Sequence, residues 1–159
     1  LEETVGVDPA DCTLNLVPTV GGRVLMALSD AGLQYFVAAA RANVGIKAGR
    51  YFFEVRVAAL MDPAETGRRP ATAVPRQSIR VGFSLGKSSL FLGDTEESVC
   101  FDSDGSFMFN KQRTAGPQRF TRDQVVAVLL NLDALSPTGN TVSLFRDGER
   151  ASPPQPLPG

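Results

Sequence analysis

Two segments in which apolar and polar side chains alternate constrain the fold of this chain most strongly. In residues 51–57, one side of an extended backbone carries Tyr51, Phe53, Val55 and Val57. In residues 79–84, the corresponding side carries Ile79, Val81 and Phe83. A period of two residues is typical of a strand with one face in a core and the other toward solvent. Since no helical period persists for three turns, we expect an all-β protein.

Short strands are expected in the N-terminal part of the chain as well. Residues 13–17, 23–28 and 33–38 are separated by turn residues, among them two consecutive glycines after Val20 and a glycine after Ala31. Glycine and aspartate at such intervals punctuate strands, because they adopt the backbone angles that tight turns need. The spacing therefore predicts an antiparallel meander of three strands.

The register of a hairpin over residues 98–110 can be deduced from its apolar side chains. A turn of Asp104 and Gly105 alone would set Phe101 opposite Met108. A three-residue loop over 103–105 sets Phe101 opposite Phe107 instead, which gathers four large apolar side chains on one face. We therefore predict the three-residue loop, with Gly105 in the left-handed conformation that such loops require.

The C-terminal third should contain a central strand and its neighbour. Residues 125–132 are apolar on both faces, which is typical of a strand covered on both sides, and residues 141–146 should pair with it. Residues 151–159 contain four prolines, so they cannot form a central strand and are interpreted as a proline-rich tail or linker after a domain of residues 1–150.

Composition excludes several classes of function. The formal charge of −1 gives the chain no general attraction to nucleic acid or to anionic membranes. The sequence contains no histidine, which removes the commonest general base and the commonest transition-metal ligand. Cys12 and Cys100 are interpreted as buried free thiols. We therefore expect a protein that is not an enzyme, with no cofactor, no metal site and no membrane association.

Two long loops are basic. Residues 58–78 contain Arg68, Arg69 and Arg76, and residues 110–123 contain Lys111, Arg113, Arg119 and Arg122. Exposed charge of this kind is most often simply solvated. The functional alternative is a docking site for an acidic or phosphorylated peptide, since arginine binds such groups through paired hydrogen bonds. Direct RNA binding is a weaker alternative, because these loops contain almost no aromatic side chain for stacking on bases.

Five segments, in order along the chain, resemble the motifs of SPRY domains. They are residues 41–45, 92–102, 109–111, 123–126 and 141–148. Within the family, the chain is most similar to SPRY domains of heterogeneous nuclear ribonucleoprotein U-like proteins. It departs from the family at Phe83, where a tryptophan is common, and in its C-terminal strands, which are missing. The resemblance implies an antiparallel, concanavalin-like β-sandwich that binds other proteins.

The missing strands raise the question of what covers the edge of the sheet. An uncovered edge leaves backbone donors and acceptors unpaired. Strand 141–146 is therefore expected to have a second neighbour besides 125–132. The expected source is further sequence of the same protein, followed by a partner chain or residues 1–11.

The resemblance also suggests the sites and the setting of binding. Lys47 matches a position at which some family members place a basic residue that meets an acidic peptide, and Arg41 and Arg80 are further candidates. The resemblance implies a scaffold within a larger nuclear or RNA-processing assembly, hence an intracellular protein of the nucleus rather than the cytoplasm. The alternative is a domain that recruits targets to a helicase, a methyltransferase or a ubiquitin ligase.

Overall fold

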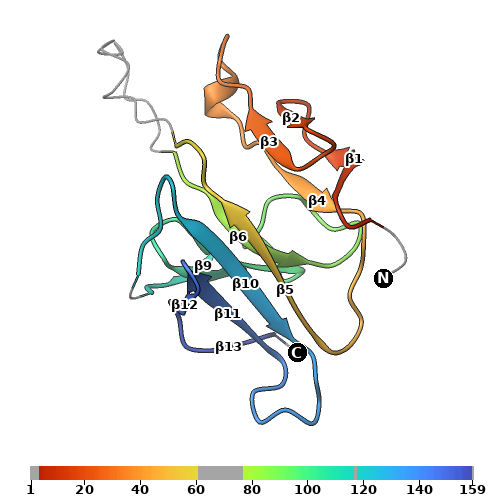
Figure 1. Ribbon diagram of the computed structural model, residues 1–159, viewed down its shortest axis with the longest axis vertical. Coiled ribbons are helices and arrows are strands. Elements are labelled where there is room, and N and C mark those ends of the chain that lie inside the picture. Colours follow the sequence, from red (N-terminus) through yellow and green to blue (C-terminus); the bar gives the residue numbers. More distant parts are fainter. Residues whose placement is uncertain (1–3, 61–76, 117, 159) are drawn as a thin grey trace. The chain divides into compact units, whose positions relative to one another are not determined.

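A computed structural model describes residues 4–60, 77–116 and 118–158, and the chain divides into two compact units, Leu1–Ile46 and Lys47–Gly159. Almost all of its regular structure is β-strand (Figure 1). In the described residues, no helix combines the length and the hydropathy needed to cross a bilayer.

The first unit consists of two short antiparallel pairs. Strand β1 (Val7–Cys12) pairs with β4 (Ala40–Ala42), and β2 (Leu16–Thr19) pairs with β3 (Val24–Ala27). The prediction of a third meander strand over 33–38 is wrong. Gly32 adopts a left-handed φ of 92°, and Leu33–Tyr35 forms the 3-10 turn η1. The Leu33 N–H then bonds to the Asp30 carbonyl rather than to a neighbouring strand.

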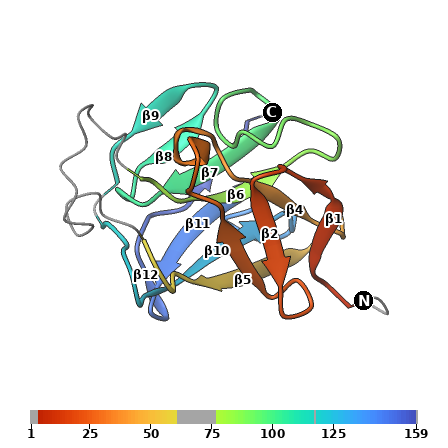
Figure 2. The same ribbon diagram turned by 90° about the horizontal axis from the view of Figure 1, so that it is seen from above.

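The second unit is an antiparallel β-sandwich. One sheet has the order β12-β11-β10-β5, with β13 pairing along β11, and the other has the order β6-β7-β8-β9. Figures 1 and 2 show these sheets as two layers. The strands are β5 (Arg50–Arg56), β6 (Arg80–Ser84), β7 (Ser98–Asp102), β8 (Phe107–Phe109), β9 (Gln112–Thr114), β10 (Val125–Asn131), β11 (Thr141–Arg146), β12 (Glu149–Arg150) and β13 (Gln155–Pro156).

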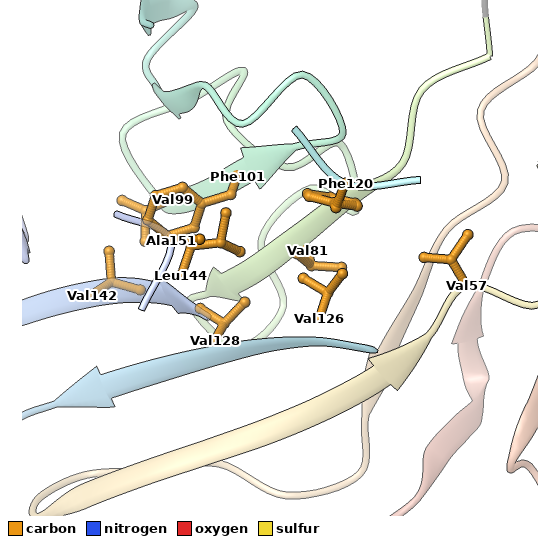
Figure 3. Packing of buried hydrophobic residues seen from close by; sticks show 10 residues of the cluster. All are labelled: Val57, Val81, Val99, Phe101, Phe120, Val126, Val128, Val142, Leu144 and Ala151. Atoms are coloured by element: carbon orange, nitrogen blue, oxygen red, sulfur yellow. The ribbon is translucent and has the colours of Figure 1, made fainter. Parts of the chain in front are cut away.

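The core of this unit lies between the two sheets, as the predicted alternation requires. Figure 3 shows the apolar side chains of β10 and β11 facing those of β6 and β7. Val126, Val128 and Val142 are fully buried, and Val81 and Phe101 meet them from the opposite sheet. The cluster is completed by Val57, Val99, Phe120, Leu144 and Ala151. Val125–Asn131 lies between two neighbouring strands, which confirms its prediction as a central strand.

The predicted hairpin register is confirmed. Phe101 pairs with Phe107 and Val99 pairs with Phe109, and Gly105 has a φ of 83°. The faces of β5 and β8 that point away from this core differ in their exposure to solvent. Phe52 on β5 is 62% exposed, whereas Met108 on β8 is buried. A loop over residues 85–97 accounts for the burial of Met108, because a Cβ added to its Gly93 would approach the Met108 side chain within 2.9 Å.

The proline-rich segment, predicted to be a tail or linker, lies along β11. Asp147 and Gly148 both have positive φ, which forms the tight turn that returns the chain as β12. Residues 155 and 156 then pair with the other end of β11 as β13. Strand β11 therefore has the second neighbour that was expected, but the chain's own residues 149–156 provide it. The prolines are tolerated because this position is at the edge of the sheet.

Candidate interaction site

A buried carboxylate organises the end of the sandwich where β7 turns into β8. The Oδ1 atom of Asp102 accepts hydrogen bonds from the backbone N–H groups of Asp104 and Ser106, each at 3.0 Å. The Asp102 side chain is only 7% exposed. An aspartate that bonds to the backbone two residues ahead fixes a turn, and here it fixes the three-residue loop over 103–105.

Arg113, from β9, is held against this turn by three side chains. Its guanidinium lies 2.9 Å from the Oδ2 atoms of both Asp102 and Asp104, and its Nε–H donates to the Ser106 hydroxyl oxygen at 2.9 Å. The hydrogen bond to Asp104, followed by the negative charge of Asp102, raises the pKa of Arg113 above its usual value. Arg113 is therefore a positioned and permanently charged group.

Gly116 and Gln118 lie tightly against the same turn. A Cβ at Gly116 would overlap the Gly105 carbonyl, and a Cβ at Gly105 would overlap the Gln118 carbonyl. Phe120 is fixed beside the turn, since its side chain is buried and its N–H bonds to the Ser103 carbonyl at 3.0 Å. Glycine is needed at both close approaches because any side chain would strike backbone.

These elements leave an open hollow at the surface. It is lined by Asp104, Ser106, Arg113, Ala115, Gly116 and Arg119. The Nε atom of Arg119 lies 3.8 Å from Asp104, and its side chain is 75% exposed. At that distance the contact is a loose ion pair rather than a hydrogen bond. Arg113 is thus committed to the turn, whereas Arg119 can turn its donors toward a carboxylate or phosphate of a bound partner. The hollow offers ion pairing and hydrogen bonding.

The residues predicted from the family resemblance have other contacts. Arg41 forms an ion pair with Asp11, which links β4 to β1 within the first unit. Lys47 is exposed at the start of the second unit. The two arginines that are described, Arg41 and Arg80, therefore belong to different units and different local contacts. Arg68, Arg69 and Arg76 lie outside the described residues.

Arg80 holds the loop over residues 85–97. Its Nη1 donates to the Leu92 carbonyl at 2.7 Å and lies 2.9 Å from the Asp94 carboxylate. Beneath this loop, Cys100 has no exposed surface, and burial raises the pKa of its thiol to about 12, against the opposing effect of the Arg80 charge. Cys12 and Cys100 are both free thiols, as predicted, but Cys12 is only partly buried, so the prediction that both are buried holds for Cys100 alone.

The sequence indicated the individual residues of the hollow, but it did not predict that they lie together. The sequence predicted Arg113 and Arg119 only as basic loop residues and Asp104 only as a turn residue, and Asp102 entered only as the last residue of the segment 92–102 that resembles SPRY domains. The signal that connects them is the two aspartates of the turn followed by an arginine on the next hairpin. Among the described residues, no three histidine, cysteine, aspartate or glutamate side chains gather as a metal site would require.

The likeness to known proteins is one of fold and comes from solved structures alone. No protein-family model and no curated protein sequence matches this chain. Among solved structures, the chain is similar to the SPRY domain of human HERC1, with a TM-score of 0.66 and 18% identity over 94% of this chain and 79% of that one. It is also similar to stonustoxin, with a TM-score of 0.58 and 16% identity over 89% of this chain and 21% of that one. The chain therefore has the β-sandwich fold of SPRY domains, which confirms the predicted fold class.

Proposed function

We propose that this chain is a non-catalytic protein–protein interaction module, and that it serves as a scaffold in a larger nuclear or RNA-processing assembly. The fold supports the general part of the proposal, because SPRY-type sandwiches hold loops rigidly at the ends of their sheets. The sequence resemblance to ribonucleoprotein U-like proteins supports the particular setting.

The observation that carries the proposal is the contrast between the two arginines of the hollow. Arg113 is fixed by Asp102, Asp104 and Ser106, so it stabilises the turn and presents a constant positive charge. Arg119 is three-quarters exposed and only loosely paired. An acidic or phosphorylated side chain entering the hollow can take Arg119 as its partner at little cost, because that arginine gives up only one long contact.

The test compares two arginines of the same loop. Arg119→Glu reverses the charge in the hollow, whereas Arg122→Glu is a matched control, since Arg122 is also exposed and lies 3.5 Å from Asp123 outside the hollow. A fluorescent peptide of alternating aspartate and serine, with and without phosphate on the serines, serves as the probe. We expect Arg119→Glu to weaken binding by about tenfold and Arg122→Glu to leave it within about twofold. Equal effects of the two substitutions would contradict the proposal.

A further inference from the structure

The outer face of the β5-containing sheet carries a second set of exposed groups, distinct from the hollow. Directly paired residues of neighbouring strands share a face, so Phe52 lies beside Leu129, and Glu54 lies in one row with Ala127, Phe145 and Arg150. Phe53, Val55 and Val128 face the core from the other side of this sheet. The residues of the Phe52 row therefore point away from the core.

An apolar centre occupies this outer face. Phe52 is 62% exposed, and Leu129 and Phe145 are partly exposed. Ala127, between Glu54 and Phe145, is nearly covered at 5%. A single exposed apolar residue needs no explanation, but three neighbours on adjoining strands form a contiguous patch, and such patches mark interaction surfaces.

Arg150 is held in place on this face. Its guanidinium carbon lies 4.7 Å from the centroid of the Phe145 ring, and its Nη1 donates to the Ser143 hydroxyl oxygen at 2.8 Å. The tight turn at Asp147 and Gly148 sets this position, because it brings Arg150 opposite Phe145. A cation fixed in this way loses little side-chain entropy when it meets an anion.

The charges around the apolar centre are predominantly positive. Of the described residues paired on this face, Arg50, Arg56 and Arg150 are exposed together with one carboxylate, Glu54, which gives three positive groups and one negative. Arg50 and Arg56 are six positions apart on β5, a span of about 20 Å. A second copy of the chain would present the same excess of positive charge, so self-pairing of this face is disfavoured.

We infer that the outer face formed by β5, β10, β11 and β12 binds an acidic peptide segment that carries a large apolar side chain. The apolar side chain packs against Phe52 and Leu129, and carboxylates on either side of it meet Arg50, Arg56 and Arg150. An extended segment of about seven residues spans this distance. RNA is the less suitable occupant, because Glu54 stands among the arginines and Arg150 covers the Phe145 ring on which a base would stack.

The experiment uses the full chain and a fluorescent peptide of about seven residues, with phenylalanine at its centre and aspartate or glutamate on both sides. The comparison probe replaces the phenylalanine by serine. Phe52→Ser and Arg56→Glu should each weaken binding of the first peptide by about tenfold, and the serine-containing peptide should bind about tenfold more weakly than its parent. Both residues are exposed, so the thermal melting of the variants should match that of the parent. Arg150→Gln provides a third variant if one of these does not fold.

Arg119→Glu separates this inference from the proposed function. If the peptide with phenylalanine loses affinity only in Arg119→Glu, the hollow binds it and the inference about the outer face is wrong. If it loses affinity only in the variants of the outer face, the inference stands independently of the hollow. Binding of a single-stranded RNA oligonucleotide that depends on Phe52, or a dimer that Phe52→Ser dissolves, would also overturn the inference.

Discussion

The ring of Phe53 on β5 meets the ring of Phe83 on β6 edge to face, with centroids 5.4 Å apart and planes at 77°. The two strands belong to opposite sheets of the sandwich, so this contact ties one layer to the other. An edge-to-face pair directs the positive rim of one ring at the negative face of the other. Phe83 therefore helps to hold the two sheets together, although the resemblance to SPRY domains favours a tryptophan at this position.

Truncation of this aromatic pair should destabilise the sandwich. Phe53 is partly buried, so Phe53→Ala should lower the free energy of unfolding by about 3 kcal/mol, toward the lower end for a core phenylalanine. A double-mutant cycle with Phe53→Leu and Phe83→Leu should give a coupling energy of about 1 kcal/mol. Urea denaturation measures both quantities. A coupling energy near zero would mean that the rings contribute only by the area they bury.

Much of the sandwich was predictable from the sequence because large apolar side chains alternate with other residues in β5, β6 and β7. The pairing of Phe101 with Phe107 followed from one requirement, that large apolar residues share a face, and a shift by one residue would have set Phe101 opposite Met108 instead. The sides of β5 were assigned correctly for the same reason, although Tyr51, placed on the core side, remains 39% exposed near the end of its strand.

The errors arose where local composition and tertiary contacts favour different structures. The apolar run at 33–38 suggested a strand, but Gly32 starts a 3-10 turn there. The prolines after Arg150 suggested a linker, but β11 offered an unpaired edge on which prolines are tolerated. The association of Arg113 with Asp102 depends on the pairing of β8 with β9, which brings together residues that no periodic pattern connects.

Gly82 should be irreplaceable by alanine at its position in β6. A Cβ built on Gly82 would overlap the Val99 carbonyl oxygen and would lie 2.6 Å from the Cα of Cys100. Since both obstacles are backbone, the strands would have to separate locally, and Gly82→Ala should cost about 2 kcal/mol or more. Gly86→Ala is the matched control, because nothing lies within 4 Å of a Cβ at that position. Similar unfolding midpoints for the two variants would refute the close approach of β6 and β7.

The stability of the second unit should depend on pH through Cys100. Burial raises the pKa of this thiol from 9.0 to about 12, so above pH 9 the unfolded chain loses the proton while the folded chain keeps it. Stability from this group is therefore complete below about pH 9 and is lost as the pH rises toward 12, by at most about 1.4 kcal/mol per pH unit. Cys100→Ala lacks this dependence. The stability difference between parent and variant should thus shrink as the pH rises from about 9 to about 10.5, and a constant difference would contradict the prediction.

The segment after Arg150 should contribute to the stability of the folded second unit, which a flexible linker would not do. The Leu144 N–H donates to the Ser152 hydroxyl oxygen at 2.9 Å, and the Ala151 N–H donates to the Leu144 carbonyl at 2.8 Å. Both donor–acceptor pairs are buried, so Ser152→Ala leaves a backbone N–H without its partner and should cost about 1–2 kcal/mol.

Removal of residues 151–159 should cost considerably more, because β11 then loses β13 and the core loses Ala151. Removal of Pro158 and Gly159 alone is the control and should leave the urea midpoint unchanged, since Leu157 and its bond to the Asn140 carbonyl remain. If both truncations unfold at the same urea concentration as the parent chain, the segment is a linker after all.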